Sequence, residues 1–341
     1  MIRTTGARTI PPSPFSPKSK KNMKRNWPPQ QRRHPPPAGN RESKMPSFIA
    51  SLTGFVLRTT GIYRKLFTGG PQFQTNIAKS RAQPTPEPDA KARGSVHVAH
   101  TEFAGRTVWT LAPKDREPTA HILYWHGGGY VYPAAAVHWD FLAHMAKVHG
   151  WSVTAPLYPL APESNAEKAT QWAMDFTRAY TDGLGGKAFV MGGDSAGGGL
   201  AAAVAQMARD TGCAQARALI LICPWLNLDP AHPEQAQIEP RDGILTISGI
   251  TDAGRIYAGN VPLTDMRCSP LFGSWDNLPP ILAFGGGNDI LVTDARALKA
   301  KHPTVAYREL AGMLHDWPIF TFRESRAAQA DMAAFAASAL T

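Results

Sequence analysis

The chain has 341 residues, of which 43% are hydrophobic and 18% charged, as is typical of a soluble globular protein with a sizeable core. Its formal net charge of +10 comes from the first 45 residues, which hold eleven Lys or Arg and one acidic residue. The other 296 residues hold 25 basic and 25 acidic residues. Because this body is neutral, there is no electrostatic case for nucleic acid as a partner.

Residues 1–44 form a basic segment that carries nine of the thirty prolines. It has too few apolar side chains to offset the entropy of ordering, so we expect a disordered tail. Translation that starts at Met23 or Met45 would make this tail an artefact of start-site choice. The tail lacks the apolar run of a secretion signal, and no stretch of the chain reaches the roughly 18 apolar residues of a membrane span.

The next segment, residues 47–67, has an apolar periodicity that predicts an amphipathic helix. A linker rich in Pro, Lys and Arg is expected near residues 80–94. The cysteines, Cys213, Cys223 and Cys268, are odd in number and widely spaced, so they indicate neither a disulfide framework nor a zinc site. They favour a reducing cytoplasm, and no metal or cofactor is expected.

From about residue 97, short apolar runs alternate with helical stretches. Strands are predicted at 106–111, 120–125, 151–157, 187–192, 217–223, 280–285 and 304–309, and helices at about 137–149, 164–181, 195–211, 291–301 and 323–339. This alternation predicts an α/β fold with a mostly parallel central sheet and helices on both faces. Ligands bind such sheets beyond the carboxyl ends of the strands. Residues 226–275 are less regular, and we expect an insertion that helps to roof the site.

The turn between the predicted strand 187–192 and the following helix has the sequence Gly193-Asp194-Ser195-Ala196-Gly197. This G-x-S-x-G pattern displays a serine on a sharp turn, where flanking glycines remove clashes with the strand and helix. Ser195 is therefore the predicted nucleophile, and Asp194 is expected to accept backbone N–H groups in the turn. No Lys-Ser or Lys-Thr pair follows the glycines, which argues against a phosphate-binding loop.

A second glycine cluster, His126-Gly127-Gly128-Gly129, directly follows the predicted strand 120–125. The N–H groups of Gly127 and Gly128, together with that of Ala196, are predicted to form a three-donor oxyanion hole. His126 is expected to hold this loop through side-chain hydrogen bonds and not to act as a base.

Five motifs, in this order, resemble those of the hormone-sensitive lipase family of α/β-hydrolases. They are HGGGY (126–130), LYPLAPE (157–163), GDSAGG (193–198), NDILVTD (288–294) and GMLHDWP (312–318). The resemblance covers residues 97–341 and implies the α/β-hydrolase fold for them as a catalytic domain. It implies that residues 45–96 are an N-terminal helical cap with its linker, and that Glu163 braces the oxyanion loop. The implied activity is that of a serine carboxylesterase on short- to medium-chain acyl esters.

A serine hydroxyl needs a base to take its proton and an acid to orient that base. His315, in a loop after the last predicted strand, is the predicted base and also matches the family's histidine. His138, His144 and His149 share a helical stretch without metal-ligand spacing and are expected at the surface.

The predicted acid is Asp289, which ends a strand 26 residues before His315 and completes the chain order Ser, Asp, His. Asp294 is the alternative, because the usual Pro of the family's Asp-Pro-Leu is absent after Asp289. Asp316 is expected to hydrogen bond within its own loop.

Two other functions remain open at this point. The same triad can hydrolyse an amide, a formamide or a peptide bond, and a protein of this fold can also bind a small molecule without catalysis. The joint presence of Ser195, Asp289 and His315 disfavours the non-catalytic binder. The expected partner is a small-molecule ester, without nucleic acid or a membrane span, and a homodimer is compatible with the sequence.

Overall fold

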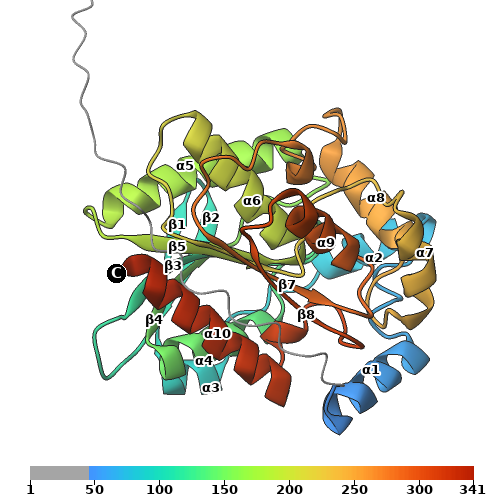
Figure 1. Ribbon diagram of the computed structural model, residues 1–341, viewed down its shortest axis with the longest axis horizontal. Helices are drawn as coiled ribbons and strands as arrows, with labels where there is room; N and C mark the ends of the chain where they lie inside the picture. The colour runs from blue at the N-terminus through green and yellow to red at the C-terminus, as the bar shows by residue number, and fades with distance from the viewer. Residues whose placement is uncertain (1–45) are drawn as a thin grey trace, which may run out of the picture. The chain divides into compact units, whose positions relative to one another are not determined.

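The structure, a computed structural model, describes residues 46–341, so the tail predicted over residues 1–44 lies outside the described residues. An eight-stranded sheet in the order β1-β2-β4-β3-β5-β6-β7-β8 runs through this part of the chain (Figure 1). Its strands are β1 (His97–Phe103), β2 (Arg106–Ala112), β3 (Ala120–Trp125), β4 (Trp151–Pro156), β5 (Phe189–Asp194), β6 (Leu219–Ile222), β7 (Ile281–Gly286) and β8 (Ala306–Leu310). Strand β2 pairs antiparallel with β1 and β4, and the other pairs are parallel.

Helices cover both faces of this sheet (Figure 1), with α5, α6 and α9 on one face and α3, α4 and α10 on the other. The helices are α1 (Phe48–Thr60), α2 (Pro71–Arg81), α3 (Ala90–Ser95), α4 (Ala136–His149), α5 (Ala166–Gly183), α6 (Ser195–Asp210), α7 (Pro233–Ile238), α8 (Ile247–Ala258), α9 (Val292–Lys301) and α10 (Arg323–Leu340). The predicted α/β fold with a mostly parallel, doubly covered sheet is confirmed. None of the described helices is both long and apolar enough to cross a membrane.

Strand β1 was not predicted, because its sequence, HVAHTEF, lacks a continuous apolar run. It lies at the edge of the sheet, and only Val98 and Phe103 are half-buried. Ala104 and Gly105 join it to β2 with φ values of 46° and 72°, which is the left-handed backbone of a two-residue hairpin. The hydrogen bonding of β1 to β2 across the hairpin therefore favours the extended conformation of β1 more than burial of its side chains does.

The N-terminal helices also differ from the prediction. Helix α1 ends at Thr60 instead of continuing to residue 67, because Gly61 takes a left-handed conformation with φ 60° and caps the helix. The predicted linker near 80–94 ends early, since α3 begins at Ala90 with the Asp89 side chain as its N-cap.

The irregular segment 226–275 contains α7 and α8 and binds the residues between α1 and α2. One guanidinium nitrogen of Arg64, Nη1, donates to the carbonyl oxygens of Glu239 and Asp242 at 2.7 and 2.6 Å. Thr246 is the N-cap residue of α8, and its hydroxyl donates to the carbonyl oxygen of Phe67. The N-terminal helices and this insertion are thus joined by buried and half-buried hydrogen bonds.

This junction has almost no spare room at Gly249. A Cβ at Gly249 would overlap the carbonyl of Phe67, whereas a Cβ at Gly54 in α1 would meet no atom within 4 Å. We expect Gly249→Ala to lower the free energy of unfolding by about 1–3 kcal/mol through overpacking. Gly54→Ala should leave it unchanged or raise it by up to about 1 kcal/mol. Chemical denaturation of the two variants beside the native protein checks this, and equal midpoints for all three would contradict the close packing.

Candidate active site

Ser195 is the first residue of α6 and directly follows the last residue of β5. Its φ is 51°, a left-handed conformation that is rare for a residue with a side chain. A Cβ at Gly193 would overlap the carbonyls of Gly197 and Trp125, and a Cβ at Gly197 would overlap the Trp125 carbonyl as well. The predicted reason for the flanking glycines is confirmed, since only glycine lets the strand, turn and helix approach so closely.

The structure brings the three predicted residues of the triad together. His315 lies in the loop between β8 and α10, and its Nε2 is 3.0 Å from Ser195 Oγ. Its Nδ1 is 2.9 Å from Oδ2 of Asp289, which follows β7. All three side chains are buried. This is the geometry of a nucleophile, a base and an acid that orients the base.

The charge of His315 is set by two neighbouring carboxylates. Burial lowers the pKa of His315, but Asp289 and Asp316 outweigh burial and hold the pKa well above its usual value. The Oδ2 of Asp316 is 3.1 Å from His315 Nε2, the same nitrogen that faces Ser195. Asp316 therefore contacts His315, the neighbouring residue of its own loop. Burial raises the pKa of Asp316 to about 7, against the attraction of His315.

The loop that carries Asp289 is held from the insertion 226–275. The Ile290 N–H donates to Oδ2 of Asp242 at 3.0 Å, and the Leu291 N–H donates to Oδ1 of Asp289 at 2.8 Å. The other oxygen of Asp242, Oδ1, accepts the N–H groups of Ile244 and Leu245. Burial and the charge of Asp289 raise the pKa of Asp242 to about 6. Asp242 was not singled out in the sequence, because it is 47 residues from Asp289 and lies in an irregular segment.

The alternative acid, Asp294, points away from His315. Its Oδ2 accepts the N–H groups of Leu226 and Asn227 at 2.7 and 2.8 Å. Burial raises the pKa of Asp294 to about 7. Asp294 thus anchors the start of the insertion, and of the two candidates it is Asp289 that contacts His315.

The predicted oxyanion donors need one correction. The Gly127 N–H donates to Oδ2 of Asp194 at 3.0 Å, so this N–H is directed away from the site, and the prediction for it is wrong. A Cβ at Gly127 would lie 3.1 Å from the Ser195 Cβ, so the loop does run beside the serine. Within residues 46–341, no acceptor takes the N–H of Gly128 or Gly129. The N–H groups of this loop that remain available to a ligand are therefore those of Gly128 and Gly129, and not that of Gly127.

The buried carboxylate of Asp194 has three hydrogen-bond donors around it. Besides Gly127, the Tyr124 hydroxyl donates to Oδ1 at 2.6 Å, and Nε2 of His138 lies 3.1 Å from Oδ2. His138 is buried, so the expectation that it lies at the surface is wrong. Burial raises the pKa of Asp194, but His138 outweighs burial and the net shift is downward. A histidine in the first turn of a helix beside the glycine loop was the only sequence signal for this pair.

His126 holds the loop as predicted. Its Nδ1 is 2.7 Å from the Gly127 carbonyl oxygen, and its ring stacks on Tyr158 at 4.5 Å between centroids. The Tyr158 hydroxyl donates to the His126 carbonyl at 2.8 Å. Glu163 differs from expectation, because its carboxylate is at the surface, 3.3 Å from Arg81, and does not touch the glycine loop. Glu163 is five residues after Tyr158, which contacts His126, so any link between Glu163 and the glycine loop is indirect.

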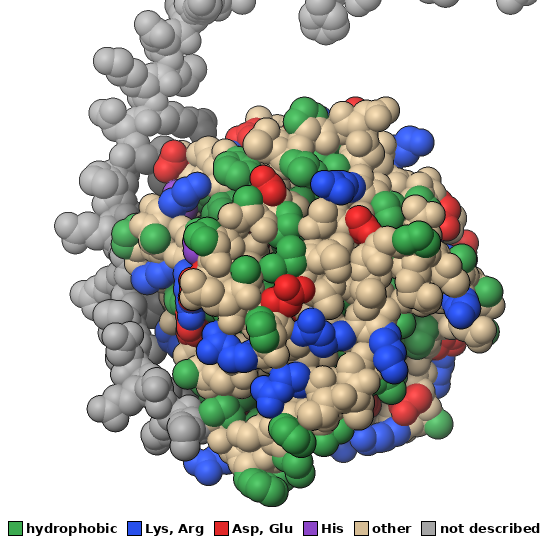
Figure 2. All heavy atoms as spheres, turned by 90° about the vertical axis from the view of Figure 1, so that its right-hand side faces the viewer, with side chains coloured by type: hydrophobic (Ala, Val, Ile, Leu, Met, Phe, Trp, Pro, Cys, Tyr) green, Lys and Arg blue, Asp and Glu red, His purple; other side chains and the backbone are tan. Residues whose placement is uncertain are grey.

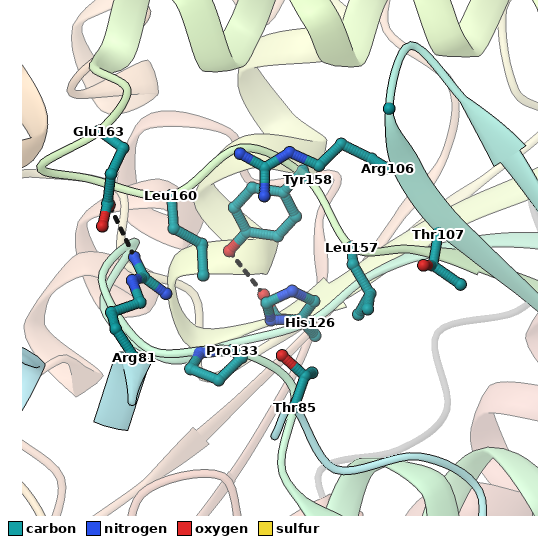
Figure 3. A pocket seen from close by; sticks show the side chains of 11 residues that line it. Arg81, Thr85, Arg106, Thr107, His126, Pro133, Leu157, Tyr158, Leu160 and Glu163 are labelled. Atoms are coloured by element: carbon teal, nitrogen blue, oxygen red, sulfur yellow. Dashed lines mark hydrogen bonds and ion pairs between the residues drawn. The ribbon is translucent and has the colours of Figure 1, made fainter. Parts of the chain in front are cut away.

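A cavity of about 360 Å³ lies next to His126 (Figure 3). Its lining includes Arg81 and Thr85 from α2 and the residues after it, Arg106 from the β1–β2 hairpin, and Tyr158. Figure 3 shows Arg81 directed to Glu163, and the Tyr158 hydroxyl directed to His126. The triad residues do not line this cavity, so it is separate from the space in front of Ser195.

One group of side chains in the described part of the chain has ligand atoms close enough for a metal. Cys223, Asp289 and His315 offer atoms within 4.8 Å of one another. Both ring nitrogens of His315 already face Asp289 and Ser195, so the hydrogen bonds of the triad account for this cluster. Burial raises the pKa of the Cys223 thiol, which disfavours the thiolate that a metal needs.

A serine on a strand-to-helix turn, with an acid and a histidine from later loops of a mostly parallel sheet, defines the class of α/β-hydrolases. The profile described as alpha/beta hydrolase fold matches residues 122–319. A Mycobacterium tuberculosis protein named as the acetyl-hydrolase LipR is 32% identical over 252 residues, which are 72% of this chain and 82% of that protein.

Two solved structures extend the comparison. A hormone-sensitive lipase from a metagenome library has a TM-score of 0.75 at 21% identity and covers 87% of this chain and 100% of its own. An esterase from the bacterial hormone-sensitive lipase family has a TM-score of 0.68 at 25% identity and covers 78% and 96%. The chain therefore belongs to the hormone-sensitive lipase family of α/β-hydrolases and is an enzyme of the serine-hydrolase type.

The two acids can be separated by matched substitutions. We expect Asp289→Asn to lower kcat by about 10³- to 10⁴-fold, because the amide no longer stabilises the imidazolium of His315. Asp294→Asn should keep kcat within a few-fold and lower the free energy of unfolding by about 1–2 kcal/mol, since one buried acceptor is weakened. Hydrolysis of p-nitrophenyl butyrate together with thermal unfolding measures both. A larger loss of kcat for Asp294→Asn would reverse the assignment.

His138 is predicted to position the oxyanion loop through Asp194. His138→Ala should lower kcat by about tenfold with little change in KM, because the Asp194 that holds Gly127 loses a donor. His149, at the other end of α4 against His144, offers the control His149→Ala, which should keep the native kcat. If the two variants have the same kcat, the His138–Asp194 contact serves stability alone.

Proposed function

We propose that the protein is a serine carboxylesterase that hydrolyses short- to medium-chain acyl esters through an acyl-enzyme. The observation that carries this proposal is the single line of contacts from Asp289 through His315 to Ser195, at 2.9 and 3.0 Å. The relatives named as acetyl-hydrolase and esterase support an ester as the substrate.

In this mechanism His315 Nε2 takes the proton of Ser195, and Oγ attacks the ester carbonyl carbon. The tetrahedral intermediate collapses, the alcohol leaves with the proton from His315, and the acyl group stays on Ser195. Water then gives a proton to His315 and attacks the acyl carbonyl carbon. The second tetrahedral intermediate collapses, the acid is released, and His315 returns the proton to Ser195 Oγ. Asp289 holds the Nδ1–H tautomer throughout and stabilises the imidazolium.

The oxyanion would be stabilised by the N–H groups of Gly128, Gly129 and Ala196. Ala196 lies in the first turn of α6, where N–H groups have no partner within the helix and the helix dipole is positive. The φ values of Gly128 and Gly129, 118° and 61°, are left-handed, so the loop needs glycine at both positions. Removing one such donor typically costs about 10²- to 10³-fold in kcat.

The location proposed for this reaction is the cytoplasm. Cys213, Cys223 and Cys268 are all unpaired, which suits a reducing compartment. No cofactor enters the proposed reaction, because serine, histidine and water complete both halves of the cycle.

The proposal is tested by hydrolysis of p-nitrophenyl esters from acetate to palmitate, with the native protein and Ser195→Ala. Activity should peak at short or medium acyl chains and fall by about 10⁴-fold or more in the variant, because members of the triad act as a unit. If the native protein is inactive on every ester but cleaves the matching p-nitroanilides, its substrate is an amide and the proposal of an ester is wrong. Activity that survives in Ser195→Ala would mean that another residue is the nucleophile.

The pH dependence of hydrolysis depends on Asp316. His315 acts as a base only when it is neutral, and the Asp316 carboxylate beside Nε2 helps to raise the pKa of His315. Asp316→Asn removes that negative charge, so the pKa of His315 should fall and the acidic limb of kcat/KM should move to lower pH. A pH–rate profile of both proteins measures the shift. An unchanged limb, or one that moves to higher pH, would show that Asp316 does not control His315.

A further inference from the structure

Helix α1 is apolar on two sides, and only one of them is covered. Ala50 is buried, and Leu57, two turns later on the same side, packs against the core. The opposite side carries Phe48, Ile49, Leu52, Phe55 and Val56, which are 45 to 80% exposed. At 100° per residue these five side chains fall within an arc of about 120°. A helix with two apolar sides needs a second apolar surface to bury the outer one.

This exposure is concentrated at one place. Of the ten exposed large hydrophobic side chains in residues 46–341, eight lie between Phe48 and Leu66. Figure 2 shows the right-hand side of Figure 1, and hydrophobic side chains gather at its lower edge, where Figure 1 places α1. Such a patch marks a surface that contacts a protein or a lipid.

The charge around the patch distinguishes between these partners. Residues 46–86 contain five Lys or Arg and no Asp or Glu, and the sequence before them adds a further surplus of positive charge. Arg58 and Lys65 are exposed beside the apolar side chains. Two copies of this surface placed face to face would bring like charges together, which disfavours a dimer. A basic, apolar helix surface complements anionic lipid.

We propose that α1 and the segment up to Leu66 form a docking surface for an anionic lipid membrane. The apolar stripe enters the boundary between headgroups and acyl chains, and the neighbouring basic side chains contact the headgroups. This inference is independent of the bond that the enzyme hydrolyses.

The test is sedimentation of the full chain with vesicles of phosphatidylcholine, alone or with roughly one-third phosphatidylglycerol. The native protein should bind the anionic vesicles, and less at high salt. Leu52→Gln/Phe55→Gln should bind at least about tenfold more weakly, because two large apolar side chains no longer enter the lipid. Val148→Gln/Phe272→Gln, which changes exposed hydrophobics elsewhere, should bind like the native protein.

Two results would overturn the docking surface. In the first, Leu52→Gln/Phe55→Gln and the native protein bind anionic vesicles equally. The apolar side chains of α1 would then not contribute, and the binding would come from basic residues elsewhere. The other is a native dimer in analytical ultracentrifugation that becomes a monomer in this variant, without vesicle binding by either. That result would make the patch an interface between copies of the chain.

The cavity beside His126 carries a second, independent inference, which rests on polar atoms without partners. The Nδ1 of His126 faces a carbonyl oxygen and must carry the proton, so Nε2 is a buried acceptor, and no group in residues 46–341 reaches it. The Nε of Arg81 is likewise buried without an acceptor, while its Nη2 bonds Ala161 and Glu163. A buried polar atom without a partner is costly, so a ligand or water must satisfy these groups.

Among its buried atoms without partners, the lining therefore offers one donor, Arg81 Nε, and one acceptor, His126 Nε2. The Glu163 carboxylate also lines the cavity and is paired with Arg81. Arg106 has no hydrogen-bond or ion-pair partner within residues 46–341 and brings an uncompensated positive charge to the cavity. Thr85 and Thr107 add hydroxyls, and Leu157, Leu160 and Pro133 add apolar surface. The unpartnered Arg81 Nε–H and the positive charge of Arg106 suit a carboxylate, and the unpartnered acceptor His126 Nε2 suits a hydroxyl next to it.

We propose that this cavity binds a small 2-hydroxy acid with an apolar body. The carboxylate would contact Arg106 and the Nε–H of Arg81, and the hydroxyl would donate to His126 Nε2. About 360 Å³ is within the range of small-ligand sites.

Calorimetric titration with mandelate and with phenylacetate, which lacks only the hydroxyl, tests this site. Mandelate should bind several-fold more tightly, and Arg106→Ala should weaken it by at least about tenfold through loss of a charged donor. Arg217→Ala, at an exposed arginine two residues before β6, should bind mandelate like the native protein. Ester hydrolysis by Arg106→Ala should be unchanged. Equal binding of the two acids, equal binding by the two variants, or tighter binding of inorganic phosphate would each overturn the proposal.

Discussion

The site depends on the hydrogen bonds that the buried carboxylate of Asp194 accepts. Asp194 is the last residue of β5, so it enters the interior directly before the strained Ser195. There it accepts the Tyr124 hydroxyl from β3, the Gly127 N–H from the glycine loop and Nε2 of His138 from α4. One charge thus joins the serine turn, a neighbouring strand and the oxyanion loop. Because a buried carboxylate without donors is very unfavourable, these parts keep their relative positions.

The histidine side of the site is organised by carboxylates as well. Asp289 contacts His315, Asp242 holds the N–H that follows Asp289, and Asp294 anchors Leu226. Burial and the nearby charge of Asp289 raise the pKa of Asp242. In the proposed mechanism, the same charges would favour the imidazolium that forms while Ser195 attacks. The segment 226–275 therefore holds the loop that carries Asp289 through Asp242.

Much of the architecture was predictable because it is written in local patterns. Each of the strands β2 to β8 lies within two residues of its predicted position. The strands β3 to β7 contain buried apolar side chains, whereas the edge strand β8 is half-buried along its length. Ser195, Asp289 and His315 were found because G-x-S-x-G and the order Ser, Asp, His restrict the candidates. Strand β1 escaped prediction, since an exposed edge strand has little apolar pattern. The helix predicted over 47–67 was too long, because periodicity does not show that Gly61 ends it.

What the sequence determined by itself was the type of fold and the serine turn, and it singled out Ser195, Asp289 and His315, which the structure brings together. These follow from hydrophobic periodicity and from glycines that a sharp turn requires, both of which are local properties of the chain. The tertiary structure alone decided where the Gly127 N–H is directed, because it meets Asp194 only when β3 and β5 lie side by side. It likewise decided that His138 is buried, that Asp242 holds the acid loop and that Glu163 lies at the surface. Each of these depends on a partner dozens of residues away, and hydrogen bonds over such separations leave no periodic trace in the sequence.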